Sequence, residues 1–229
     1  MLDMRALKAS MFIEVSAFFR VLFAQRIFDT IDLKACIAFS LTALAVYILD
    51  RSFDFSSSKE IFLAIAFALA ASLIYPNNPY IPFLALFVGF MYSKGIKGFR
   101  LKKGYGIKNI VTAVTWGTII AFFSKIDIFI IAFFTLKSFI ITVLSDIKDL
   151  KEDLEVGIKT IPAILGDKTL HFLMFVNILL YVIVLTWMPL PCYLLSLLIS
   201  FYAIINVKPK VAQAEFILQS ILISSTSFD

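Results

Sequence analysis

The sequence predicts an all-α polytopic membrane protein with about nine transmembrane helices. Of its 229 residues, 61% are apolar and only 16% are charged, and the mean hydropathy is +0.94. Water-soluble domains carry about 25% charged residues, so this chain has too little polar surface to cover a globule in water. Residues of the apolar runs show no strand-like alternation, and open sheet edges are not tolerated in lipid. Helices that cross a bilayer are therefore expected.

Nine apolar runs supply the predicted helices. A bilayer core of about 30 Å needs about 20 apolar residues, and fewer where neighbouring helices shelter the segment. Two of the tight connections carry proline pairs, Pro76 with Pro79 and Pro189 with Pro191, where a missing N–H is tolerated. The last run is the least apolar, because Ser and Thr replace large side chains there. In order, the predicted helices are 9–25, 33–49, 60–75, 80–93, 107–123, 127–145, 170–188, 190–206 and 212–226.

A single domain, residues 1–229, is the simplest organisation. No Gly/Ser-rich linker or low-complexity segment divides the chain, and no removable signal peptide is expected at its start. Cys36 and Cys192 lie inside apolar runs, where they are expected to act as small apolar residues.

Positive charge predicts the topology. Most of the 21 Lys and Arg residues lie in the amino-terminal segment and in the loops after the second, fourth, sixth and eighth helices. By the positive-inside rule these parts are cytoplasmic, in a multi-pass protein of the cell membrane. The net charge of +5 is then a matter of topology. The expected partner is the lipid bilayer and not a nucleic acid, while the oligomeric state stays open.

Acidic residues gather at two helix ends on the same predicted side. Asp50 and Asp54 close the second helix at a spacing of four, so on a continuing helix they share one face. Asp146, Asp149 and Asp153 close the sixth helix at i, i+3 and i+7, again on one face. Like charges placed in this way repel one another unless a cation lies among them. Two such ends facing each other would form a carboxylate-lined mouth at the cytoplasmic edge of the bundle.

The residue types at this edge suit a metal and a phosphate group. Mg²⁺ prefers carboxylate oxygens and lets substrate phosphates complete its octahedron. Basic residues between the fourth and fifth helices would bind phosphate oxygens; they are Lys94, Lys97, Arg100, Lys102, Lys103 and Lys108. A Phe-rich bundle beside them would hold a long apolar chain, so the pattern predicts an amphiphilic diphosphate as ligand.

Each of these features, taken alone, also has an ordinary structural origin. A basic juxtamembrane loop commonly reflects topology and contact with lipid headgroups, and an acidic run after a helix is commonly a solvated face. Two acidic faces at the same membrane level favour a functional site. Lys137 lies near the middle of the sixth predicted helix, where a charge is a functional candidate by default; it would otherwise snorkel or pair with Glu14.

The second acidic end resembles a known signature. Segment 149–166 combines the aspartates with Gly157, Lys159, Thr160 and Pro162 in an order similar to the second signature of the UbiA superfamily of intramembrane prenyltransferases. That signature is an aspartate-rich helix end followed by Gly, Ile or Val, a basic residue, Ser or Thr, Leu or Ile, and Pro, and it closes with Leu or Phe and a second Gly. The family also has nine helices, so the resemblance implies a UbiA-type bundle.

The rest of the resemblance is weaker and includes one departure. Residues 50–54, Asp-Arg-Ser-Phe-Asp, are similar to the latter half of the family's first signature. Residues 92–109 look like the loop between its fourth and fifth helices. The Asn-Asp pair that opens the first signature is replaced here by Val46-Tyr47. That Asn helps to hold Mg²⁺ in the family, so the first metal site is depleted.

The resemblance implies a Mg²⁺-dependent prenyltransferase of isoprenoid lipid biosynthesis. It would transfer a polyprenyl group from a polyprenyl diphosphate to a lipophilic acceptor by ionising the allylic diphosphate. The implied catalytic residues are Asp50, Asp54, Asp149 and Asp153, which together with Asp146 would hold the metal. The implied substrate-binding residues are Arg51, Tyr92, Arg100, Lys102, Lys103 and Lys159.

Three alternatives compete with this interpretation. A CDP-alcohol phosphatidyltransferase also uses spaced aspartates, but it needs a glycine directly after the first of them, and none follows Asp50 or Asp146. A transporter or channel would keep its ionisable groups near the bilayer midplane, whereas most acids here lie at one surface. A catalytically weak or silent relative that binds isoprenoid lipid stays open because of Val46-Tyr47.

Overall fold

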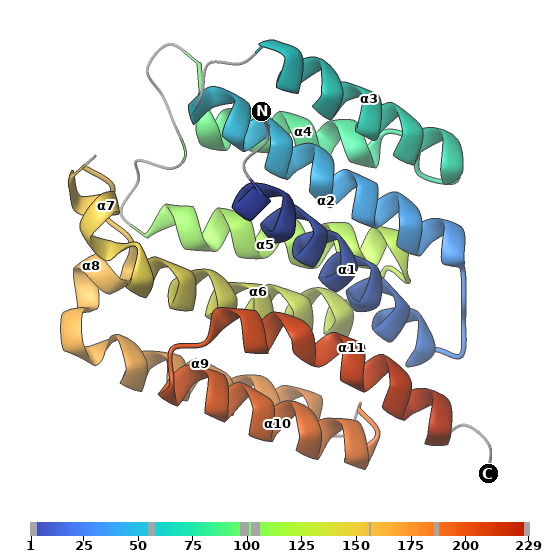
Figure 1. Ribbon diagram of the computed structural model, residues 1–229. Coiled ribbons are helices and arrows are strands. Elements are labelled where there is room, and N and C mark those ends of the chain that lie inside the picture. Colours follow the sequence, from blue (N-terminus) through green and yellow to red (C-terminus); the bar gives the residue numbers. More distant parts are fainter. Residues whose placement is uncertain are drawn as a thin grey trace. The chain divides into compact units, whose positions relative to one another are not determined.

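The computed structural model describes residues 4–54, 58–96, 101, 106–155, 157–185 and 188–226. Over these residues the chain forms nine helices of 13 or more residues and three short ones (Figure 1). The long helices are α1 (Met4–Arg26), α2 (Leu33–Asp54), α3 (Ser58–Ile74), α4 (Ile81–Ser93), α5 (Ile107–Phe123), α6 (Ile128–Lys148), α9 (Thr169–Val184), α10 (Leu190–Ile205) and α11 (Pro209–Thr226). The short ones are α7 (Leu150–Glu155), α8 (Ile161–Leu165) and the 3₁₀ helix η2 (Gly166–Lys168). Each predicted segment corresponds to one long helix, so the all-helical prediction is confirmed.

The apolar character of these helices is that of a membrane protein. Within the described residues, three segments are long and apolar enough to cross a bilayer: Leu33–Phe53, Ile128–Lys148 and Ile161–Val184. Ile81–Ser93, Ile107–Phe123 and Leu190–Ile205 are shorter apolar helices. Large apolar side chains also point outward, including Phe62, Leu73, Val182 and Leu198. Lipid is the solvent in which such outward-facing residues are stable.

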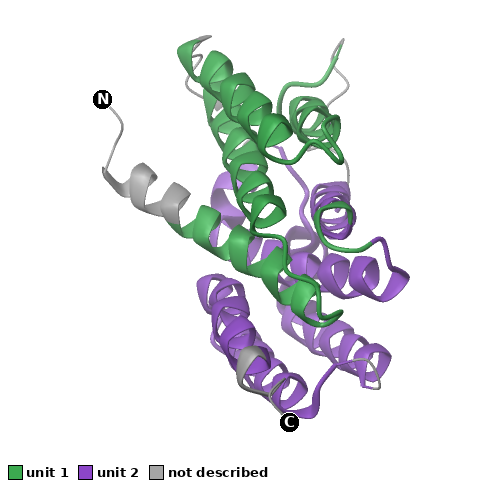
Figure 2. Cartoon of the chain, turned by 90° about the vertical axis from the view of Figure 1, so that its right-hand side faces the viewer, with its two compact units in different colours: residues 1–100, 122–125 green, residues 101–121, 126–229 purple. Residues whose placement is uncertain are grey.

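The chain divides into two compact units, which are described separately (Figure 2). Unit 1 comprises Met1–Arg100 and Phe122–Lys125. In this unit α2 is central and packs against α1, α3 and α4. Gly89 allows α4 to approach α2 closely, because a Cβ atom at this position would lie 3.3 Å from Cγ1 of Val46. The side-chain amide of Gln25 fixes the connection from α1 to α2 by accepting from the backbone N–H of Asp32 over 2.9 Å.

Unit 2 comprises Leu101–Ala121 and Ile126–Asp229. Here α6 packs against α7, α8, α9 and α11, while α10 packs against α9 and α11. Asp127 caps the start of α6 and accepts from the N–H of Phe129 over 2.8 Å. The rings of Phe133, Phe134 and Phe216 form the aromatic core between α6 and α11, with Phe134 and Phe216 centroids 5.3 Å apart.

The observed ends of α2 and α6 differ from the predicted ends, and both ends carry predicted site residues. α2 continues beyond the apolar run to Asp54, so Asp50 and Asp54 do lie on one continuous helix. α6 continues to Lys148, after which Asp149 is its non-helical C-cap and α7 begins at Leu150. The continuous helical face predicted for the second acidic cluster is therefore interrupted at Asp149.

Candidate functional site

In unit 1 the predicted residues lie where α2 and α4 end. The hydroxyl of Ser93, in the last turn of α4, donates to a carboxylate oxygen of Asp50 on α2. Ser93 is buried and Asp50 is half-buried, so this bond holds the carboxylate in a defined position at the helix end. Tyr92, the neighbour of Ser93, is also half-buried.

Arg51 is held along α2 by an aromatic side chain one turn earlier. Its Nη1 donates to the hydroxyl oxygen of Tyr47 over 2.8 Å, and its guanidinium carbon lies 5.6 Å from the centroid of the Tyr47 ring. The spacing of four residues places both side chains on one helix face. Tyr47, which stands where the family's first signature has an Asp, therefore orients the guanidinium of Arg51.

Val46 has an apolar role in unit 1. It packs against a cluster that includes Ala45, Leu49 and Leu86, and it is the residue that meets Gly89 of α4. An Asn at this position would place an amide against apolar neighbours. Val46, which replaces the Asn of the first signature, therefore contributes to the apolar core of unit 1.

Some members of the predicted set fall outside the part of the chain that the structure describes. They are the side chain of Asp54 and the residues Lys97, Arg100, Lys102 and Lys103.

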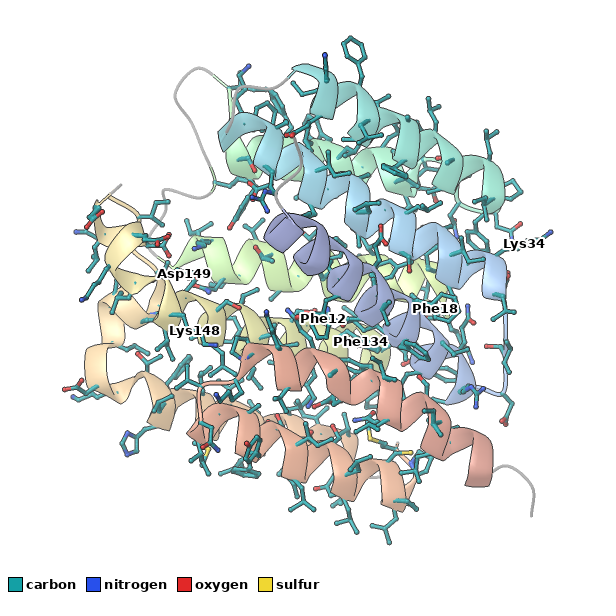
Figure 3. All side chains as sticks on the ribbon, viewed as in Figure 1. Phe12, Phe18, Lys34, Phe134, Lys148 and Asp149 are labelled. Atoms are coloured by element: carbon teal, nitrogen blue, oxygen red, sulfur yellow. The ribbon has the colours of Figure 1, made fainter. Side chains whose placement is uncertain are left out.

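In unit 2, Lys108 of α5 lies between two of the predicted aspartates. Its Nζ is 2.7 Å from Oδ1 of Asp146 and 2.8 Å from Oδ2 of Asp153. The three side chains are only 13%, 5% and 10% exposed, respectively. The repulsion expected between the acids is therefore relieved by an ammonium group of the chain itself. Asp149 is exposed, and Figure 3 shows it with Lys148 at the end of α6.

Asn109 completes the environment of Asp146. Its Nδ2 donates to Oδ2 of Asp146 over 2.8 Å, and its Oδ1 accepts from the backbone N–H of Ile161 over 3.3 Å. Asn109 is fully buried. Both oxygens of Asp146 thus have partners, and α5, α6 and α8 are joined at one point.

Glycines explain how the second signature folds. The N–H of Gly157 bonds to the carbonyl of Leu154 and that of Ile158 to the carbonyl of Asp153, with Gly157 at φ +74°. This is the Schellman ending of a helix, which requires a left-handed residue. Asp153 is thereby held at the end of α7, immediately before the turn.

The chain then starts α8 with Thr160 as N-cap residue and Pro162 in the first turn. Thr160 is fully buried, and its hydroxyl oxygen has no hydrogen-bond partner among the described residues. The carbonyl of the preceding Lys159 accepts from the N–H of Gly106 over 2.8 Å. The side chain of Lys159 is exposed and follows the carboxylates closely in sequence.

The donor set of unit 2 fits a cation. Oxygens of Asp146 and Asp153 already converge on one positive centre, and carboxylate oxygen is the ligand type that Mg²⁺ prefers. Within the described ranges, no three or more His, Cys, Asp or Glu side chains are grouped so that they could hold a metal by themselves. A divalent ion here would accordingly use two carboxylates and take further oxygens from water or substrate.

A second polar cluster lies deep in unit 2. Nζ of Lys137 on α6 is 2.7 Å from Oε1 and 3.0 Å from Oε2 of Glu215 on α11, and it donates to the hydroxyl of Tyr181 over 2.9 Å. Ser196 and Gln219 donate to Oε1 of Glu215 over 3.0 and 3.2 Å. All five residues are buried.

This cluster identifies the partner of Lys137. The sequence left snorkelling and pairing with Glu14 as the structural alternatives, but the ammonium is buried and contacts Glu215. Helical spacing gives no sign of this pair, because its two members are 78 positions apart in the chain.

Comparisons with solved structures identify the fold. A UbiA homologue from Archaeoglobus fulgidus bound to Cd²⁺ aligns with 96% of this chain and 98% of its own, with a TM-score of 0.66 and 15% identity. A structure of digeranylgeranylglyceryl phosphate synthase aligns with 97% of this chain and 94% of its own, with a TM-score of 0.57 and 14% identity. No protein-family model matches the sequence, and no curated protein matches it.

The fold and the apolar helices define an all-helical membrane protein. More particularly, the chain has the UbiA fold, so the resemblance that its acidic signatures suggest is confirmed at the level of fold.

Proposed function

We propose that the protein is a Mg²⁺-dependent intramembrane prenyltransferase that moves a polyprenyl group from a polyprenyl diphosphate to a lipophilic acceptor. The observation that carries the proposal is the buried cluster of Lys108, Asp146 and Asp153 at the end of an apolar helix, in a chain with the UbiA fold. Such a cluster provides carboxylates for a metal and an ammonium group for a diphosphate at one place. In this proposal residues 1–229 form one functional unit.

The carboxylates have the role of metal ligands in this proposal. In unit 1, Asp50 and Asp54 would hold Mg²⁺. In unit 2, Asp146 and Asp153, whose oxygens converge on the ammonium of Lys108, would hold it, with Asp149 as a further ligand by resemblance. When bound, Mg²⁺ neutralises the charge that develops on the diphosphate as the allylic C–O bond breaks. Of the two similar structures, one is of a synthase and the other holds Cd²⁺, which supports a divalent-metal enzyme.

The cationic and aromatic residues act on the substrate. Arg51, oriented by Tyr47, and the exposed Lys159 donate to phosphate oxygens. Tyr92 presents an aromatic face to the allylic cation. Apolar helices keep water from the cation until the acceptor attacks. By resemblance, the phosphate-binding set also includes Arg100, Lys102 and Lys103.

Charge distribution supports a multi-pass arrangement in the cell membrane. The Lys- and Arg-rich loops favour a cytoplasmic amino terminus, and the acidic helix ends would share that side. The polyprenyl chain would then extend from a cytoplasmic diphosphate into the bilayer.

The proposal is tested by binding of a geranylgeranyl diphosphate analogue to detergent-purified protein, with Mg²⁺ and with EDTA. We expect binding that requires the metal and that is lost in Asp149→Asn/Asp153→Asn. Asp167→Asn is the matched control, because it removes an exposed carboxylate from η2 in the same unit. Equal binding in EDTA, or in the double variant, would refute a metal–diphosphate site.

One observation favours a second candidate, a relative that binds isoprenoid diphosphate without transferring it. Val46 packs in the apolar cluster of unit 1 where the family's first signature has a metal-binding Asn. The two candidates differ in product formation. Metal-dependent binding combined with no transfer to any of a panel of quinone, glycerol-lipid, porphyrin and carotenoid acceptors would favour the silent relative.

A further inference from the structure

Lys108 occupies the position that a bridging cation would take. Its single ammonium contacts one oxygen each of Asp146 and Asp153, at 2.7 and 2.8 Å. These distances are those of strong charge-assisted hydrogen bonds. A divalent ion that bridges two carboxylates needs the same convergence of oxygens. The ammonium of Lys108 and a divalent metal would therefore occupy the same position and cannot both be bound there.

The backbone delivers Lys108 to this place. Gly106, at φ +65°, turns the chain into the first turn of α5 and bonds to the carbonyl of Lys159. The next residue after Lys108, Asn109, holds the second oxygen of Asp146 and the N–H of Ile161. The carboxylate pair is thus preorganised around a cation before any ligand binds.

Charge balance decides what a metal would do at this pair. Two carboxylates and one ammonium leave a net charge of −1 in surroundings that are largely shielded from water, since no side chain of the three is more than 13% exposed. A divalent ion would bring the pair to neutrality. The displaced ammonium would then lie beside the metal without its anionic partners, where an anion can take it up.

We propose that Lys108 is a positioning residue that competes with the divalent metal for Asp146 and Asp153 and is released to the diphosphate when the metal binds. The metal and the anion then bind cooperatively: the metal frees the ammonium, and the anion keeps it from returning. This inference rests on the proposed function for the identity of the anion, whereas the competition itself rests on the ion-pair geometry alone.

The competition is tested with Mn²⁺ alone, by electron paramagnetic resonance titration of the full-length protein in detergent. Lys108→Gln keeps a hydrogen-bonding side chain but removes the charge, and Lys108→Arg keeps the charge. We expect Lys108→Gln to bind Mn²⁺ with a Kd about tenfold lower than that of the wild type, the ratio expected when one competing charge-assisted contact is removed. Lys108→Arg should resemble the wild type. A residue with only a structural role would weaken metal binding when replaced.

Lys168→Met is the matched control, because Lys168 is an exposed lysine of η2 in the same unit and its loss changes the net charge equally. Its Mn²⁺ affinity should equal that of the wild type. Adding inorganic diphosphate tests the coupling: it should tighten Mn²⁺ binding in the wild type and do so at least about threefold less in Lys108→Gln, as expected if one charged contact to the anion is missing.

An unchanged or weaker Mn²⁺ affinity in folded Lys108→Gln would overturn the inference, as would no Mn²⁺ binding in any variant. A Tm close to that of the wild type identifies the folded protein, and Asp146→Asn provides a second route if Lys108→Gln does not fold. Asp146→Asn should weaken Mn²⁺ binding, and no change would likewise overturn the inference. Failure of the proposed function is recognised separately, by metal-independent binding of the prenyl diphosphate to the wild type.

Discussion

Replacing Glu215 by Leu should destabilise the protein by about 3 kcal/mol, because it leaves the buried ammonium of Lys137 without its counter-charge. Lys137 is 1% exposed and contacts both oxygens of Glu215, at 2.7 and 3.0 Å. Among the described residues, only the hydroxyl of Tyr181, at 2.9 Å, continues to accept from the ammonium in the variant. The environment cannot rehydrate the charge, since its neighbours are buried as well.

Two magnitudes bear on this figure. Breaking one half of a buried ion pair costs about 3–5 kcal/mol in soluble proteins, whereas a neutral interhelical hydrogen bond in a membrane bundle contributes about 0.6 kcal/mol on average. Lys137 and Glu215 form an ion pair with two contacts, so the larger magnitude applies, and we take its lower end because lipid-embedded reference states find partners too. The double variant Lys137→Met/Glu215→Leu should lie within about 1 kcal/mol of the wild type, since it leaves no unpaired charge.

The assay is reversible unfolding by SDS in mixed micelles, followed by circular dichroism, for both single variants and the double variant. Ser200→Ala is the matched control, because it removes a neutral interhelical bond to Asn177 in the same unit, where both residues are buried. Its cost should be about 0.6 kcal/mol. Single variants within about 1 kcal/mol of the wild type, or a double variant as unstable as the sum of the singles, would refute the reasoning.

Three further predictions concern two glycine turns of unit 2 and the contact of Asp50 in unit 1. Gly106→Ala should lower the free energy of unfolding by about 1–2 kcal/mol, because φ is +65° and a Cβ would lie 2.7 Å from Cδ1 of Ile161; an unchanged Tm would contradict this. Gly157→Ala should cost less, about 1 kcal/mol, since φ is +74° but no atom lies within 4 Å of the added Cβ; the reverse order of the two Tm values would show that crowding is not decisive. Ser93→Ala should weaken Mg²⁺-dependent binding of the diphosphate analogue several-fold, with a stability change of about 1 kcal/mol, because it frees the carboxylate of Asp50 from its helix-end bond; a binding isotherm identical to that of the wild type would contradict it.

The long helices were predictable because each contains an apolar run, although only three segments of the described residues are long and apolar enough to cross a bilayer by length and composition. Their ends were less so, since a helix can continue past the apolar run into charged residues: α2 ends at Asp54 and not at residue 49. In the second acidic cluster the helical face is shorter than predicted: the sequence pattern predicts one continuous helical face through Asp153, but α6 ends at Lys148, with Asp149 as its C-cap. Local capping geometry, and not helical periodicity, determines that boundary.

The sequence identified the acidic residues of the site but did not identify the residues that pair with them. Asp146 and Asp153 pair with Lys108, which lies on another helix and 45 positions before Asp153. Lys137 likewise pairs with Glu215, 78 positions away. Spacing within one helix carries no information about such contacts. A single charged residue in the middle of an otherwise apolar segment was the available signal for Lys137, and the glutamate among amides on α11 was the corresponding signal for Glu215.

The tie between α5 and the turn before α8 has a consequence for motion. The N–H of Gly106 bonds to the carbonyl of Lys159, and the N–H of Ile161 bonds to Asn109, so two amides from distant segments depend on one contact surface. We expect their hydrogen–deuterium exchange to share a single opening free energy. Segment 157–161 then moves as part of α5 and not as an independent flap. Any motion that opens this turn would accordingly displace the start of α5 as well, on the microsecond-to-millisecond scale of collective motions.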